Sequence, residues 1–291
     1  MKNIYLIVFA FLFFNECQSQ QEIIFTNDKY NNLHFNPATA GDYSELKKGG
    51  VFASYRNQWM GFEGAPTTLF LGGDILFKDQ NLGAGLTAFR DEIGINSRLE
   101  FSGSIAYKMR MSEGYLSGGL RVGFASIRSN FSNVQNVDAG DVYDNSNQSF
   151  SSFSVGFGVF YRDETLKIGL SIPRIVSLGN AIANDFQKPH LHSHLSLLLG
   201  EEYNTLRFEP TILFKYYQAA PLQTKFGLTV WINEIIGPAI YYRTSDALAL
   251  AVSLKLQDQL FVSLAYDLTT SQLKNYSDNT LEITLGYRFK E

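Results

Sequence analysis

Three histidines alternate with other residues over one short stretch of the chain. In an extended strand His190, His192 and His194 would project from the same face, with neighbours about 7 Å apart. Two of these imidazoles could bind one zinc ion if a third ligand came from elsewhere. The alternative is that they are ordinary polar positions near the mouth of a barrel. We favour this alternative because neither a cysteine nor paired carboxylates accompany the histidines. We therefore assign no metal ligand.

An acidic stretch offers a second set of candidate ligands. Asp138, Asp141 and Asp144 lie close to Asn145 and Asn147, and such oxygen ligands suit calcium. However, the spacing of three does not match the alternating ligands and central glycine of a calcium-binding loop. The stretch is therefore interpreted as a solvated outer loop.

Recognisable catalytic motifs are missing from the sequence. It contains neither Gly-x-Ser-x-Gly nor a glycine loop that would cradle phosphate. A hydrolase would need a serine within reach of one of the three histidines, and nothing in the spacing favours that arrangement. We predict a protein that is not an enzyme, with no catalytic residues and no cofactor.

The composition favours an exported protein made of strands. The chain has 291 residues, which allows one large domain or two small ones. With a net charge of −4, nothing indicates a nucleic-acid partner. Its 24 phenylalanines and 16 tyrosines, against 7 prolines, are typical of strands and of aromatic girdles.

The first nineteen residues have the features of a secretory signal. The apolar run over 4–14 is too short to span a bilayer as a helix. Cys17 and Ser19 occupy the small-residue positions that precede a cleavage site. Lipid attachment at Cys17 is the alternative, which Glu16 disfavours because a small residue is expected there. Cleavage after Ser19 would remove the only cysteine, and no later stretch is apolar for about 18 residues.

The end of the chain shows the clearest strand pattern. One face of 281–289 is apolar and carries aromatic residues at its last positions, whereas the other face is polar. A membrane barrel needs such a strand, because its last strand must pair with the first and remove both open edges. The apolar face comprises Leu281, Ile283, Leu285, Tyr287 and Phe289, and the polar face comprises Glu282, Thr284, Gly286 and Arg288.

Similar alternation recurs along the chain and predicts fourteen strands. The expected strands cover residues 51–59, 67–77, 82–90, 95–111, 115–128, 151–161, 166–172, 191–199, 206–217, 224–232, 238–243, 247–256, 260–268 and 281–289. Short turns alternate with longer loops at 129–148, 173–190 and 269–280, as in outer-membrane barrels. Because the predicted number of strands is even and the short turns follow every second strand, both termini are expected on the side of the short turns. This is the periplasmic side in such proteins.

The sequence therefore predicts an all-β protein, a transmembrane antiparallel β-barrel of outer-membrane type with about 14 strands. We expect a signal peptide over 1–19, an irregular periplasmic or plug segment over 20–48, and the barrel over 49–289. Asn27-Asp28, Asn36-Pro37 and similar pairs in 20–48 are turn signals, which explains why that segment is read as irregular.

Charged residues on the inner face allow two interpretations. They could line a selective channel, or they could pair with one another in a largely filled interior. We favour the filled interior because long side chains of both signs tend to pair. Trp59 and Trp231, with Tyr241 and Tyr242, are expected to anchor the barrel at the membrane interfaces. The expected inward charges are Arg56, Asp74, Arg98, Glu100, Arg110, Lys167, Arg207, Glu209, Lys215, Lys255, Asp267 and Arg288.

Several short motifs resemble the PorP/SprF family of outer-membrane proteins of the type IX secretion system in Bacteroidetes. They are Asn-Pro-Ala-Thr-Ala-Gly at 36–41, Tyr-Arg-Asn-Gln-Trp at 55–59, Gly-Ala-Pro-Thr-Thr at 64–68, Glu-Pro at 209–210, Lys-Tyr at 215–216, Tyr-Arg-Thr-Ser-Asp-Ala at 242–247, Ala-Tyr-Asp at 265–267 and the closing strand. One departure is Leu281-Glu282, where the family often has His-Glu.

The resemblance implies a role in protein secretion. Such proteins are partners of secreted cargo, including gliding adhesins, that carries a C-terminal secretion signal. They assist its export or hold it at the cell surface, they contact other components of the system, and outer-membrane lipid surrounds them. A passive channel or solute transporter remains the alternative, because the predicted lumen is charged.

Overall fold

The computed structural model describes residues 24–42, 49–131, 147–179, 189–201, 205–217, 221–256, 259–271, 274 and 278–289. The predicted signal peptide at 1–19, with Cys17, lies outside these residues. So do Asp138, Asp141 and Asp144 of the acidic stretch.

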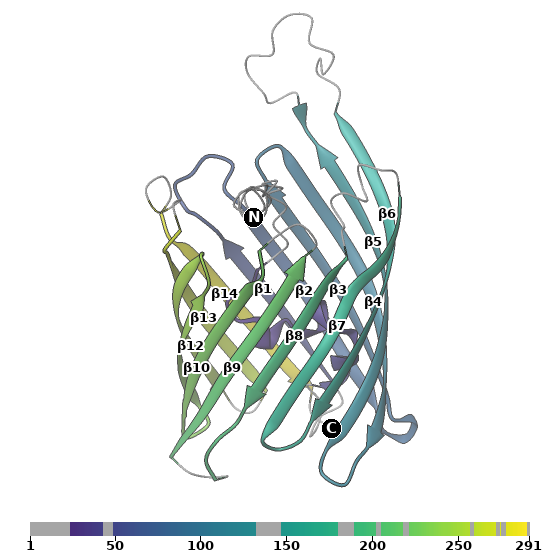
Figure 1. Ribbon diagram of the computed structural model, residues 1–291, viewed down its shortest axis with the longest axis vertical. Helices are drawn as coiled ribbons and strands as arrows, with labels where there is room; N and C mark the ends of the chain where they lie inside the picture. The colour runs from purple at the N-terminus through teal and green to yellow at the C-terminus, as the bar shows by residue number, and fades with distance from the viewer. Residues whose placement is uncertain are drawn as a thin grey trace, which may run out of the picture.

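Fourteen antiparallel strands form a closed barrel in which each strand pairs with its neighbours in the sequence (Figure 1). The prediction of fold class is therefore confirmed. The strands are β1 Gly49–Asn57, β2 Thr67–Phe77, β3 Leu82–Ile93, β4 Asn96–Arg110, β5 Tyr115–Ser129, β6 Gln148–Arg162, β7 Leu166–Gly179, β8 His190–Leu197, β9 Leu206–Tyr217, β10 Gln223–Ile232, β11 Ile236–Arg243, β12 Ala247–Leu256, β13 Leu260–Thr269 and β14 Thr280–Phe289.

The first and last strands close the barrel. β1 pairs with β14 from Gly49 opposite Phe289 to Asn57 opposite Leu281, and β1 pairs with β2 on its other side. Both edges of the sheet are thereby paired, as hydrocarbon surroundings require. The predicted role of 281–289 as the closing strand is confirmed.

Alternation along the strands separates the two faces of the wall. Large apolar side chains such as Leu86, Val122 and Phe153 are more than half exposed on the outer face, where lipid would cover them. The inner face carries buried polar residues, among them Ser54, Thr284 and Ser263. Across the described residues, no helix has the length and apolar character that a membrane span needs.

One strand is longer than its sequence suggests. The sequence predicts that this strand, β7, ends at 172, before Pro173, which has no N–H to donate to a ladder. Instead it continues to Gly179, pairing with β6 across a register shift between Val155 and Phe157. The bulge accommodates the proline, since an extra residue at a bulge need not donate to the partner strand. The predicted loop 173–190 is correspondingly shorter.

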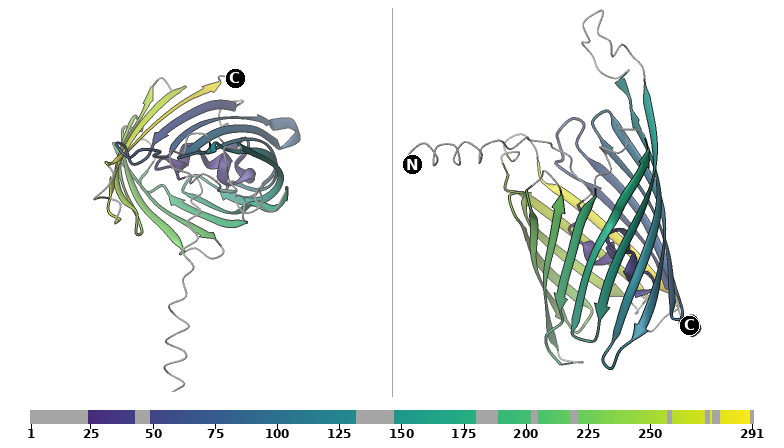
Figure 2. Two further views of the ribbon diagram at one scale, coloured as in Figure 1. Left: turned by 90° about the horizontal axis from the view of Figure 1, so that it is seen from above. Right: turned by 45° about the vertical axis from the view of Figure 1, so that its right-hand side comes forward.

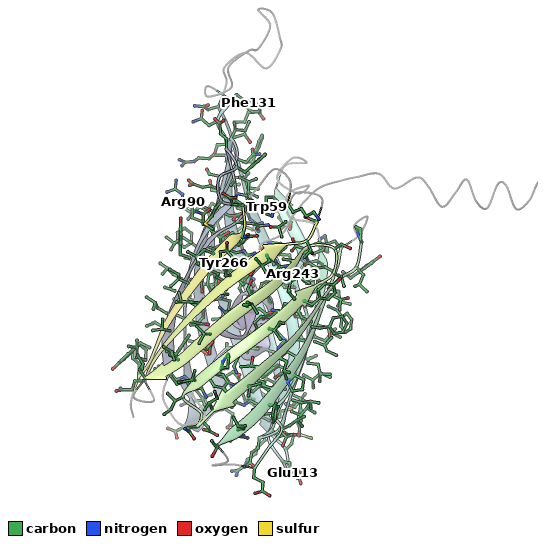
Figure 3. The ribbon with its side chains drawn as sticks, turned by 90° about the vertical axis from the view of Figure 1, so that its left-hand side faces the viewer. Trp59, Arg90, Glu113, Phe131, Arg243 and Tyr266 are labelled. Atoms are coloured by element: carbon green, nitrogen blue, oxygen red, sulfur yellow. The ribbon has the colours of Figure 1, made fainter. Side chains whose placement is uncertain are left out.

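Connections at one end of the barrel are mostly shorter than those at the other, although at the long-loop end only two residues join β3 to β4 and three join β11 to β12. Short connections follow β2, β4, β6, β10 and β12 at one end, where Phe289 also ends β14. Figure 3 shows Glu113, in one of these turns, at that end and Phe131, just after β5, at the opposite end. The three longest connections in the sequence, 130–147, 180–189 and 270–279, belong to the opposite end.

The register of closure predicts a specific cross-link. Ser54 on β1 lies opposite Thr284 on β14, and their hydroxyl oxygens are 2.9 Å apart. With Cys17 removed, the Ser54→Cys/Thr284→Cys variant should oxidise to a disulfide that changes mobility on non-reducing gels.

A matched control uses the next strand. Ser263 on β13 also lies opposite Thr284, so Ser54 and Ser263 are two strands apart, at about 10 Å. Ser54→Cys/Ser263→Cys should therefore not cross-link. Equal cross-linking of both pairs would contradict the closure described here.

Candidate functional site

The most distinctive part of the interior is the stretch 24–42, called here the internal segment. It contains the short helices η1 Asp28–Tyr30, α2 Asn32–Phe35 and η2 Pro37–Thr39, which lie inside the barrel in the view along its axis (Figure 2, left). Each helix is too brief to be stable alone, so contacts with the wall must hold the segment in place. These contacts define the candidate site.

Aromatic packing joins the internal segment to one side of the wall. Phe25 and Phe35 of the segment are buried with the wall residues Phe70 and Phe89. The ring centroids of Phe25 and Phe70 are 5.5 Å apart. Tyr30 stacks on Phe261 of β13 at 4.3 Å. An apolar core thus lies within a lumen whose walls are otherwise polar.

Two carboxylates on neighbouring strands bind the start of the segment. Glu282 on β14 accepts hydrogen bonds from the backbone N–H groups of Thr26, at 2.7 Å, and Asn27, at 2.9 Å. Asp267 on β13 accepts a hydrogen bond from the Thr26 hydroxyl at 2.7 Å. Arg56 on β1 donates to both carboxylates, at 3.0 and 2.8 Å.

Arg243 on β11 completes this cluster with a 2.8 Å ion pair to Asp267. Buried charges are costly unless they are paired, and in this arrangement both carboxylates and both guanidinium groups form ion pairs. We name Thr26, Arg56, Arg243, Asp267 and Glu282 the closure cluster, because β1, β13 and β14 meet there.

A second buried carboxylate organises the opposite wall. Glu100 on β4 pairs with Arg98 at 2.5 Å, with Arg121 on β5, and with Arg174 on β7 at 3.4 Å. Arg121 also donates to the carbonyl oxygen of His34 at 2.5 Å. Arg121 thus links the buried Glu100 to the backbone of α2.

The Asn-Pro-Ala motif has a direct structural explanation. The Asn36 side chain accepts from the Ala38 N–H at 2.9 Å, capping η2, and donates to the Val159 carbonyl of β6 at 3.0 Å. Asn36 and the turn after it press against Gly119 and Gly158, where a β-carbon would meet the segment. The segment can approach the wall so closely only because glycine has no side chain at these two positions.

The last part of the segment is fixed near the short turns. The Gly41 N–H donates to Asp74 on β2 at 2.6 Å, and Asp42 pairs with Arg162 on β6 at 3.2 Å. Burial raises the pKa of Asp42, but the positive charges of Arg162, Lys108 and Lys167 outweigh it and hold that pKa below its usual value. Asp42 therefore remains charged and paired at neutral pH.

All three predicted histidines face inward from β8 and are buried. His192 stacks on Phe35 of the internal segment at 4.8 Å, with ring planes 6° apart, and His190 stacks on Tyr217 at 4.9 Å. Within the described part of the chain, no three His, Cys, Asp or Glu residues are grouped so as to hold a metal ion. Their stacking supports a packing role, and the assignment of no metal ligand stays a prediction.

The expectation of interfacial anchoring was wrong for Trp231 and Tyr241. Both face the lumen and are buried, and the Trp231 Nε1–H donates to Glu209 at 2.8 Å. For Trp231 this inward orientation follows from the alternation along the strand, because it lies on the same face of β10 as Lys225 and Thr229. Tyr242, which follows Tyr241 on β11 and points to the opposite side of the wall, is exposed on the outer face.

Most of the predicted inward charges do line the interior, although Arg110 is exposed at the end of β4. Among the described residues, sequence reasoning missed six further inward cations, namely Lys108, Arg121, Arg162, Arg174, Lys225 and Arg243. The alternation along β5 could have identified Arg121 as inward-facing, because it lies on the same face as the buried Ser117 and Ala125. Arg174 was missed because the strand was expected to stop before Pro173.

Comparison with known proteins places the chain in a structural and functional context. A family model described as "Type IX secretion system membrane protein PorP/SprF" matches residues 17–287. No curated protein matches the sequence. Among solved structures, the Acinetobacter baumannii outer membrane protein Omp33 is similar with a TM-score of 0.51 and 6% identity, covering 84% of this chain and 100% of that chain.

A TodX ΔS2S3 mutant monoaromatic hydrocarbon channel has a TM-score of 0.49 and 10% identity, covering 90% of this chain and 94% of that chain. At these identities the likeness to Omp33 shows the barrel fold alone. The fold and the family description agree that this is an outer-membrane β-barrel.

Two adjacent glycines on β5 allow a direct test of how the segment is seated. A β-carbon at Gly119 would meet the backbone of Pro37 and Ala38, whereas one at Gly118 would meet nothing within 4 Å. Gly119→Ala should therefore destabilise the protein by about 1–3 kcal/mol, the usual cost of overpacking. Thermal unfolding in detergent would measure this cost.

Gly118→Ala is the control and should unfold like the parent protein. Hydrogen exchange of the amides in 24–42 gives a second readout, which should increase for Gly119→Ala only. Unchanged stability and exchange for Gly119→Ala would show that the segment does not press on this wall.

Proposed function

The chain belongs to the PorP/SprF family of type IX secretion system membrane proteins, and from this premise we propose that it assists the export or surface anchoring of a secreted cargo protein. The cargo would carry a C-terminal secretion signal, as a gliding adhesin does. The observation that carries the proposal is the family match, which spans nearly the whole chain. The protein would act by binding, without catalysis.

The occupied interior favours an accessory role over a conduit. The internal segment is bonded to β1, β5, β6, β13 and β14 and packs on aromatic residues of the wall. A cargo chain passing through the lumen would have to displace all of these contacts. We therefore propose that cargo is bound outside the lumen.

The end with the longer connections offers the corresponding surface. β5 and β6 extend beyond the rest of the wall at that end (Figure 1). On β7, Ile175, Val176 and Leu178 are exposed. The expected contact loops 129–148, 173–190 and 269–280 begin at these strands and at β13, although much of each lies outside the described residues. With the short turns and the end of β14 in the periplasm, this end would face the cell exterior.

The family also implies association with other components of the secretion system. The short turns would present a periplasmic surface to them, while lipid covers the apolar wall. Which component binds is a question for pull-down of the tagged protein followed by mass spectrometry.

Deletion of the gene tests the cargo role. We expect the deletion strain to lose surface display of at least one secreted protein with a C-terminal signal, measured by antibody labelling of intact cells. Complementation with a variant in which a short glycine-serine linker replaces 132–146 should restore the barrel but not the display. Normal display of every such protein in the deletion strain would refute the proposal.

A channel is the second candidate, and the charged lumen is the observation that favours it. If the internal segment fills the lumen, the purified protein should be electrically silent in planar bilayers. Removal of 24–42 should then produce steady conductance, provided that the shortened barrel retains its β-sheet circular dichroism. Steady conductance of the intact protein would instead support the channel.

A further inference from the structure

A group of lysines surrounds one tryptophan at the short-turn end of the lumen. Lys29 belongs to η1 of the internal segment, Lys167 is the second residue of β7, and Lys255 is the next-to-last residue of β12. They come together around Trp231 and Glu209. We call Lys29, Lys167 and Lys255 the lysine cluster.

The contacts within the cluster are specific. Lys29 forms an ion pair with Glu209, and its Nζ lies 4.6 Å from the Trp231 ring centroid. The Nζ of Lys255 lies 4.2 Å from the same centroid. Lys167 lies opposite Ser196 of β8, whose hydroxyl donates to Glu209 at 3.0 Å, so Lys167 is placed next to the same carboxylate. Three ammonium groups thus share one small region.

Glu209 neutralises only part of this charge. Its two carboxylate oxygens already accept hydrogen bonds from Ser196 at 3.0 Å and Trp231 at 2.8 Å, in addition to the ion pair with Lys29. Among the described residues, neither Lys167 nor Lys255 has a carboxylate within 4.0 Å.

The other nearby charges do not make up the difference. Asp42 is paired with Arg162, and Glu234 is paired with Arg207 at 2.6 Å. Arg162 and Arg288 add positive charge next to Lys167 and Lys255 respectively. Like charges held together away from bulk water repel strongly, so the region favours an anion.

We propose that the lysine cluster binds a multivalent oxyanion of the phosphate type, held between Lys167, Lys255 and Lys29. An ammonium group is a compact point charge with three donors, which suits phosphate oxygens without demanding a fixed fork geometry. A dianion would balance the two lysines that lack a carboxylate. This assignment does not rest on the cargo role, because it concerns the lumen and not the outer surface.

Such an anion would also fix the internal segment. Lys29 moves with the segment, whereas Lys167 and Lys255 belong to β7 and β12, which are separated by four strands along the wall. An anion contacting all three ties the segment to both sides of the lumen. Binding therefore stabilises the seated segment in proportion to the occupancy of the site.

Calorimetric titration of the purified full-length protein with inorganic pyrophosphate, at constant ionic strength in detergent, tests the proposal. Saturable binding is expected, with a thermal midpoint raised by a few degrees. Lys167→Met/Lys255→Met should weaken binding by about a hundredfold, roughly tenfold for each lysine. Lys274→Met, which removes an exposed lysine at the other end of the barrel, is the control and should bind like the parent protein.

Two further arms make the result decisive. Lys167→Arg/Lys255→Arg keeps both charges, so it should retain binding even if the methionine variant folds poorly. Micelles doped with a phosphate-monoester lipid, without pyrophosphate, test whether the same group comes from a lipid headgroup. Stabilisation by either source supports the assignment and identifies the source. Absence of binding from both, or equal binding by the well-folded methionine variant, overturns it.

Discussion

Pairing of every backbone amide within a closed sheet is the constraint on which the rest of this structure depends. Hydrocarbon offers no hydrogen-bonding partner, so β1 must find β14, and it does so in register from Gly49 to Asn57. Closure sends alternate side chains inward around the whole wall. The interior must then be filled or hydrated, and the segment 24–42 supplies much of the filling.

The way in which that segment is held follows from the same constraint. Polar side chains on the inner wall need partners, and an irregular backbone carries free N–H and C=O groups that need partners as well. The two requirements meet where Glu282 accepts from Thr26 and Asn27, and where Arg121 donates to His34. Ion pairs of this kind contribute less to net stability than to a single defined placement, because an alternative seating would leave charges unpaired.

Much of the wall could be predicted from the sequence, because a period of two is strong wherever one face meets lipid and the other does not. The main error, at β7, arose from reading Pro173 as an end when a bulge in the pairing with β6 absorbs it. Trp231 was misplaced because its residue type was given more weight than its parity. Arg98 lies two residues from Glu100 on the same face of β4, but the Glu100 partner Arg174 could not be predicted, since it comes from β7 and only the curved wall brings it to Glu100.

The distribution of buried charge separates two levels of specificity in this barrel. Closure and alternation are general requirements, which the low-identity likeness to Omp33 reflects. The Asn36 turn, the glycines that it presses against and the closure cluster are particular to a chain with an internal segment to seat. The contacts between segment and wall, more than the wall itself, therefore distinguish this barrel from one with an empty lumen.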